Sequence, residues 1–99
     1  MEATKYVVER QMIYSLDERS LVDTIAECDN FIDALDELEK AAQSYANDKN
    51  VAIAIFRYKF DEENQEYKYV DILLGFYGID AAKHLKVISK KKKYGLIIA

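Results

Sequence analysis

Residues 21–35 read Leu21-Val22-Asp23-Thr24-Ile25-Ala26-Glu27-Cys28-Asp29-Asn30-Phe31-Ile32-Asp33-Ala34-Leu35. Their apolar residues could form one long helical stripe, so the register of this stripe decides the fold. On a helical wheel of about 100° per residue, the apolar residues that follow Asn30 share one face, which continues to Tyr45. The earlier apolar residues fall on another side of the wheel: Leu21, Val22, Ile25 and Cys28. The hydrophobic pattern therefore slips near Asn30.

This slip predicts a strand at residues 21–28 and a helix at residues 31–47. Asn30 is suited to cap the helix, because its side-chain oxygen can accept a backbone N–H. Asp33 adds negative charge at the positive end of the helix dipole. The alternative is a single helix over residues 20–47, which would turn its first half away from the core that its second half needs.

The segments before and after this region have the pattern of strands. Residues 6–14 alternate and are rich in β-branched and aromatic side chains, and the polar residues 17–20 are expected to form a turn. After a polar break, residues 51–60 form an apolar run that is typical of a buried strand. An exposed turn at 61–66 and a second strand at 67–77 complete the clearest hairpin of the sequence.

The last quarter of the chain has two interpretations. Asp80 can cap a helix that runs to Ile88, with lysines toward its negative end, whereas the pair Val87-Ile88 favours a strand. Residues 96–98 are expected to form a short strand or a docked tail. The predicted order is ββαββα: an α+β fold with an antiparallel sheet of about four strands, covered by one main amphipathic helix, and a second short C-terminal helix.

Length and composition predict one soluble domain, residues 1–99. A chain of 99 residues with 51% apolar content can bury one core but not two. The single cysteine, Cys28, cannot form an internal disulfide, which favours a reducing cytoplasm. The sequence has neither the pattern of a signal peptide nor an apolar run of roughly 18 residues, so we expect no membrane contact.

No residue pattern predicts an enzyme, a metal site or a cofactor. His84 is the only histidine, which excludes a histidine-based metal cluster, and its spacing from Cys28 does not support a catalytic pair. We interpret His84 as a solvated residue and Cys28 as a small core side chain. Gly75 and Gly78 lack the remaining residues of a phosphate-binding loop and are expected to end or bend a strand.

Charge is segregated along the chain, whose net charge is −4. Residues 17–48 carry ten acidic residues against Arg19 and Lys40, and residues 83–93 carry six lysines and no acidic residue. The lysine cluster is a candidate for weak, salt-sensitive binding to nucleic acid, although a pI near 5.0 makes nucleic acid an unfavoured partner. It could equally neutralise a helix C-terminus. The cluster comprises Lys90, Lys91, Lys92 and Lys93.

The acidic part of the chain has a sharper interpretation. Carboxylates spread over a helix face can imitate the phosphate spacing of a duplex and so occupy a basic groove on a nucleic-acid enzyme. In size, acidity and composition, the chain resembles small phage and plasmid inhibitors, including some anti-restriction and anti-CRISPR proteins. This resemblance implies nucleic-acid mimicry as an alternative function. The helix residues expected to carry it are Asp33, Asp36, Glu37 and Glu39.

The aromatic residues of the predicted hairpin favour a protein-binding function. They outnumber what one helix can cover, and uncovered aromatics are the usual anchors of an interface; the alternative is that two helices cover both sheet faces. We therefore predict a non-enzymatic protein-binding module, a small regulator or inhibitor from a phage or other mobile element, which also forms a homodimer through its sheet. The predicted contact residues are Tyr58, Phe60, Tyr67, Tyr69 and Tyr77.

Overall fold

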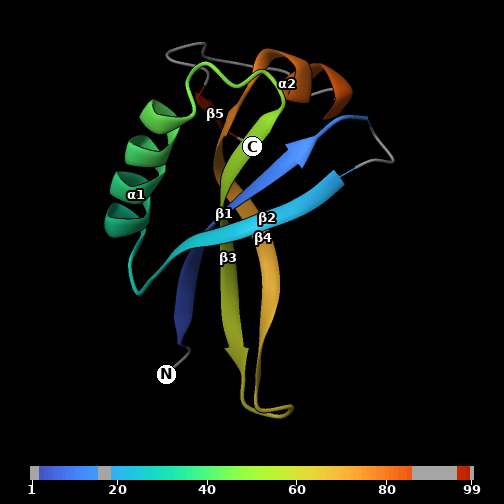
Figure 1. Ribbon diagram of the computed structural model, residues 1–99. Coiled ribbons are helices and arrows are strands. Elements are labelled where there is room, and N and C mark those ends of the chain that lie inside the picture. The colour runs from blue at the N-terminus through green and yellow to red at the C-terminus, as the bar shows by residue number, and fades with distance from the viewer. Residues whose placement is uncertain (1–2, 16–18, 86–95, 99) are drawn as a thin grey trace.

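The computed structural model describes residues 3–15, 19–85 and 96–98, and in these residues it contains an antiparallel sheet and two helices (Figure 1). The elements, in chain order, are β1 (Thr4–Ile13), β2 (Arg19–Cys28), α1 (Phe31–Ser44), β3 (Val51–Asp61), β4 (Glu66–Tyr77), α2 (Ile79–Leu85) and β5 (Leu96–Ile98). The strands lie in the order β2-β1-β3-β4-β5, with antiparallel neighbours throughout. The predicted α+β fold is confirmed, and β5 adds a short fifth strand.

The predicted break at Asn30 is also confirmed. Asn30 has an extended backbone, with φ −138° and ψ 159°, and its side-chain oxygen accepts the backbone N–H of Asp33 at 2.9 Å. Cys28, the last residue of β2, pairs with Tyr6 of β1. The alternative of one continuous helix over residues 20–47 is therefore wrong. Arg19 and Ser20, which we expected in a turn, already belong to β2.

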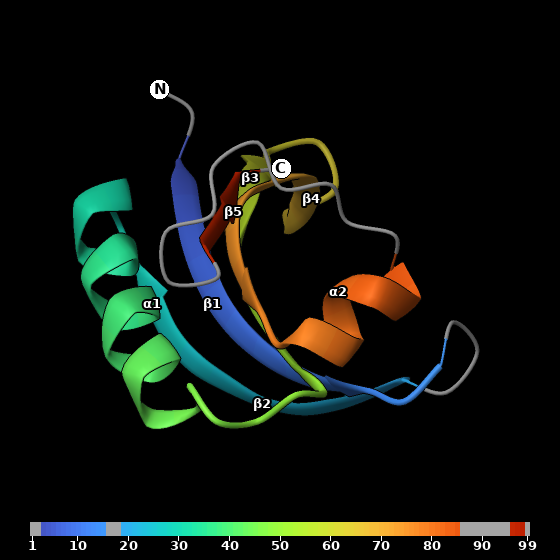
Figure 2. The same ribbon diagram turned by 90° about the horizontal axis from the view of Figure 1, so that it is seen from above.

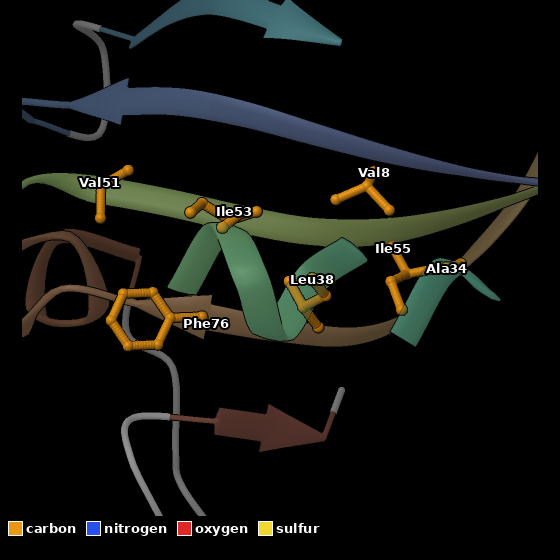
Figure 3. Close-up of a cluster of buried hydrophobic side chains, with 8 residues drawn as sticks. Val8, Ala34, Leu38, Val51, Ile53, Ile55 and Phe76 are labelled. Atoms are coloured by element: carbon orange, nitrogen blue, oxygen red, sulfur yellow. The ribbon is translucent and has the colours of Figure 1, made fainter. Parts of the chain in front are cut away.

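The helix α1 covers one face of the sheet. Its buried residues Ala34, Leu38 and Ala41 come from the stripe that the helical wheel predicts. They pack against alternate residues of the central strands, as Figure 3 shows for Leu38 beside Ile53 and Ile55. The buried core on this side consists of Val8, Ala34, Leu38, Ala41, Val51, Ile53, Ile55 and Phe76.

The helix α2 lies on the opposite side of the sheet from α1 (Figure 2). It covers only one end of that face, where Ala81 forms a second buried cluster with Ile13 and Ala52, joined by the half-buried Tyr77 and Leu85. The rest of this face has no helix over it within the described residues. Neither helix has the length and apolar character required to cross a membrane.

The start of α2 differs from the prediction. The helix begins at Ile79, so Asp80 lies in its first turn and does not cap it through its side chain. Instead, the carbonyl oxygen of Lys49 accepts the backbone N–H groups of Asp80 and Ala81, each at 2.9 Å. Gly78 makes this approach feasible, because a Cβ there would meet the backbone of Asp48 and Lys49. The predicted continuation to Ile88, the alternative strand at Val87-Ile88 and the lysine cluster all lie outside the described residues.

The ladders of the sheet are regular at its centre and irregular outside it. β1 and β3 pair without interruption from Thr4 with Lys59 to Met12 with Val51. By contrast, the β1–β2 and β3–β4 ladders each contain two register shifts, and in both cases the extra residues lie in the strand farther from the sheet centre, β2 or β4. The regular alternation of β1 and β3 therefore fixes which of their side chains share a face.

Candidate functional site

The β3–β4 hairpin projects beyond both helices (Figure 1), and its two faces carry different side chains. On the α1 side of the sheet, Arg57 donates two hydrogen bonds to Asp71, at 2.8 and 2.6 Å. At the hairpin end, Lys68 lies 2.8 Å from Asp61. Hydrogen bonds from Lys68 and Asn64 hold the pKa of Asp61 at about 2. We call the four paired residues, Arg57, Asp61, Lys68 and Asp71, the charged face.

The opposite side of the hairpin is aromatic, and we call it the tyrosine face: Phe56, Tyr58, Phe60, Tyr67, Tyr69 and Tyr77. The structure thus places all five predicted contact residues on one face and adds Phe56. Phe60 pairs with Tyr67 in the ladder, with ring centroids 5.2 Å apart. Tyr69 contacts two rings of β3, those of Tyr58 at 6.1 Å and Phe56 at 6.2 Å. Such tilted and edge-to-face contacts hold the rings in place.

Exposure differs strongly among these aromatic side chains. Tyr69 is 54% exposed and Tyr67 is 40% exposed, whereas Tyr58 and Phe60 are half-buried. Tyr77 packs against the α2 cluster, and burial together with Tyr69 raises its pKa. Its ring lies over Gly75, where a Cβ would come within 2.5 Å of the ring carbon Cε2. Tyr67 and Tyr69 are therefore the most accessible members of the face.

Three charged residues next to the tyrosine face were not among the predicted contact residues. The Lys5 ammonium lies 3.4 Å from Glu27 Oε1 and 4.4 Å from the centroid of the Tyr67 ring. Glu9 follows on the same side of β1, because Lys5, Val7 and Glu9 alternate with the residues that face α1. Val7, between them, is only 3% exposed. The two-residue period of β1 could have revealed this set, but only once β1 is known to pair with β3.

The environment of Glu9 is unusual for a carboxylate. Partial burial raises its pKa, and the charge of Glu27 on the neighbouring strand raises it further. Burial, followed by the charge of Glu9, raises the pKa of Tyr58. No ion pair joins Glu9 to a cation within the part of the chain that the structure describes. Glu9 is thus a half-buried carboxylate without a counter-ion among these residues.

The other predicted sites are less well defined. On α1, Asp33, Asp36 and Glu39 are exposed and Glu37 is half-buried, and these four form the acidic helix face. Lys40 lies within reach of it, 3.1 Å from Asp36 and 3.8 Å from Glu37. The lysine cluster at 90–93 lies outside the described residues.

Cys28 and His84, which we considered for catalysis or metal binding, do not belong to the tyrosine face. Cys28 contacts the core beside α1, and burial, followed by the charge of Asp33, raises the pKa of its thiol, which makes the thiolate less available. His84 is half-buried in α2. Across residues 3–15, 19–85 and 96–98, no three histidine, cysteine or acidic side chains are grouped as a metal site would require.

No family model matches the chain, and searches of curated proteins and of solved structures also gave no match. Function must therefore be inferred from the surfaces of the molecule itself. Among the surfaces that the described residues form, the tyrosine face combines exposed aromatic rings with charged residues at its border.

Proposed function

We propose that this protein is a non-enzymatic protein-binding module and that the tyrosine face is its contact surface. The observation that carries the proposal is the exposure of Tyr67 and Tyr69 on a part of the sheet that no described helix covers. Tyrosine offers a large apolar ring with a hydroxyl group at its tip, and it loses little conformational freedom when it binds. Tyrosine is accordingly enriched among the residues that dominate binding energies.

The support beneath these rings favours the same function. β3 pairs with β1 on one side and with β4 on the other, so the strand that carries Tyr58 and Phe60 lies in the interior of the sheet. Ring contacts from these strands also restrict Tyr67 and Tyr69. A surface that is ordered before binding loses less entropy when a partner docks, which increases affinity.

The charged face is less suited to bind a partner, which supports the choice of the tyrosine face. Its cations are already paired with carboxylates of the same hairpin, Arg57 with Asp71 and Lys68 with Asp61. Exposed pairs of this kind contribute little to stability and keep a surface solvated. We infer that the hairpin presents a solvated side and a binding side.

The alternative of nucleic-acid mimicry has weaker support. Lys40 neutralises part of the acidic helix face through Asp36 and Glu37, whereas a mimic needs an uninterrupted array of negative charge. Binding of nucleic acid by Lys90–Lys93 remains a prediction from the sequence. A role as a regulator or inhibitor, which the sequence suggested, would follow if the bound partner is an enzyme.

Affinity capture from a lysate of the producing cells tests the proposal. The immobilised chain should retain the same protein reproducibly, and the double variant Tyr67→Ser/Tyr69→Ser should lose it. Tyr14→Ser is the matched control, because Tyr14 is also 54% exposed but lies beyond the opposite end of β1. Equal capture by the double variant and the unaltered protein, or the absence of any specifically retained protein, would contradict the proposal.

A further inference from the structure

Resting on the function proposed above, we propose that the tyrosine face binds a partner segment through an arginine or lysine side chain, whose cation lies beside Glu9 and against the rings of Phe56 and Tyr69. This assigns a chemical class to the partner: a basic, partly apolar stretch of protein. Three observations carry the assignment, namely the way the face already holds a cation, the carboxylate that lacks one, and the placement of the other described cations.

The protein contains its own example of this kind of recognition. The ammonium group of Lys5 lies 4.4 Å from the Tyr67 ring centroid, 5.9 Å from that of Tyr58 and 3.4 Å from Glu27 Oε1. An aromatic ring attracts a cation through its negative face, and a carboxylate next to the ring strengthens the attraction. One end of the tyrosine face is thus already built to hold a positive charge, and Lys5 occupies it.

The next position along the face has the same components without the cation. Glu9 lies two alternate residues beyond Lys5 on β1, on the same side of the strand. Its ladder partner on β3 is Ala54, so Phe56 is its diagonal neighbour on this face, and the ring of Phe56 lies 6.2 Å from that of Tyr69, which is 54% exposed. Here a carboxylate and two rings border an accessible surface. A side chain that brings a positive charge to this position would supply the counter-ion that Glu9 lacks within the described residues.

The other described charges make the face selective for a positive partner. Beside these rings lie two carboxylates, Glu9 and Glu27, and one ammonium group, that of Lys5. The paired arginines Arg10 and Arg57 lie on the opposite side of the sheet, together with Lys68. Together the described residues Glu9, Glu27 and Lys5 carry one more negative than positive charge, which favours a cation over a phosphate or an acidic peptide. Arginine suits the site best, because its planar guanidinium stacks on rings while it hydrogen-bonds a carboxylate.

Titration of the ¹⁵N-labelled protein with defined peptides tests the inference. The probe is a capped peptide of sequence Ser-Arg-Leu-Arg-Ser, and its counterpart replaces both arginines by citrulline, which has nearly the same shape but no charge. We expect the arginine peptide to shift the amide signals of Val7, Glu9, Phe56 and Tyr69. The citrulline peptide should bind at least about tenfold more weakly.

Two variants separate the role of Glu9 from that of negative charge in general. Glu9→Gln should lower the affinity for the arginine peptide by about tenfold, because it removes the carboxylate and keeps the size of the side chain. Glu39→Gln, which removes an exposed carboxylate from α1, should leave the affinity unchanged. Unaltered dispersion of the amide signals in both variants would show that their folds are intact.

Several outcomes would overturn the inference. Equal binding of the arginine and citrulline peptides would remove the role of charge, and unchanged binding by Glu9→Gln would remove that residue. Binding of an eight-residue oligothymidylate in place of the peptide would assign the rings to single-stranded nucleic acid. Shifts that depend on protein concentration, and that the arginine peptide fails to reverse, would assign the face to a second copy of the chain. If none of the probes binds while capture still depends on Tyr67 and Tyr69, the partner class is wrong and the protein-binding function stands.

Discussion

Glu9 lowers the stability of the folded protein in its ionised form, and it lies on the proposed contact surface. Its carboxylate is half-buried beside aromatic rings, it experiences the charge of Glu27, and it has no cation partner in the described part of the chain. Both effects disfavour the ionised form in the folded state. A residue that costs stability at neutral pH is a reasonable candidate for function, because functional sites are often less stable than the rest of a fold.

The raised pKa of Glu9 gives a prediction with a definite sign. A carboxyl whose pKa is higher in the folded state than in the unfolded state takes up protons on folding, so its contribution lowers stability as the pH rises above about 4.5 and through the folded pKa. The charge that acts on it is that of Glu27 on β2, its own charge acts on Tyr58 of β3, and Lys5 lies further along β1. Glu9→Gln should therefore raise the free energy of unfolding at pH 7, and the gain should shrink toward pH 4.

Urea denaturation of both proteins at pH 4 and pH 7 measures this gain in stability. Subtracting the two free energies of unfolding at each pH cancels the contribution of carboxylates that titrate equally in both proteins. Glu39→Gln serves as a control in which no such gain is expected. If the Glu9→Gln protein is less stable than the parent at pH 7, or if its gain in stability is independent of pH, then the folded state does not disfavour the ionised form of Glu9.

At the scale of the elements, the boundary between β2 and α1 is set by local chemistry. Asn30 supplies the cap and Asp33 supplies both the capped N–H and the favourable charge, within three residues of one another. Such a signal is readable from sequence because all of its parts are adjacent in the chain. The start of α2 has no such signal, since its first N–H groups bond to the carbonyl of Lys49, which comes from the loop before β3.

The same distinction explains how much of the candidate site was predictable. The surplus of aromatic residues in the hairpin predicted Tyr58, Phe60, Tyr67, Tyr69 and Tyr77, because composition is readable from each strand alone. Lys5, Glu9 and Glu27 join them only through the pairing of β1 with β3 and with β2. The position of α2, which leaves most of this face without a helix, likewise depends on contacts between distant segments. The local aromatic content predicted the rings, whereas the charged residues beside them depend on tertiary pairing.

Substitution of the cap provides a prediction for α1. Asn30→Ala removes the acceptor of the Asp33 N–H, and we expect it to lower the free energy of unfolding by about 1 kcal/mol. Asn47→Ala is a suitable control, because Asn47 is also exposed and its side chain makes no hydrogen bond to the described residues. Thermal or urea denaturation checks both variants. A cap variant that is as stable as the parent would indicate that water replaces the Asn30 side chain without loss.

At the scale of the whole molecule, the two faces of the sheet are used differently. One face is buried by α1 along the main core, and the other is covered by α2 only near Ile13 and Ala52. The molecule is elongated, with principal extents of 40 × 28 × 24 Å, and its hairpin forms one end. The resulting shape presents an aromatic surface on a projecting part of the sheet, where a partner can approach without contact with either described helix.

Homodimerisation through the sheet is a prediction at this scale. If two copies pair through their tyrosine faces, light scattering with size-exclusion chromatography at micromolar concentration should give about 23 kDa, twice the chain mass of 11.5 kDa. The Tyr67→Ser/Tyr69→Ser protein should then elute as a monomer, and Tyr14→Ser should behave as the parent does. A parent protein of 11.5 kDa throughout the concentration range would remove the dimer and leave binding of a different partner in place.

The bulges described in β2 and β4 also have a consequence for how the protein behaves at high concentration. An outer strand with free backbone groups can recruit strands of other molecules and seed fibrils, but this requires a long ladder of even spacing. The additional residues in these two strands break that spacing, while the ladder between β1 and β3 stays regular inside the sheet. Along β2, and along the part of β4 that no described strand pairs on its outer side, we therefore expect little templating of amyloid-like growth, although aromatic rings lie in solvent nearby.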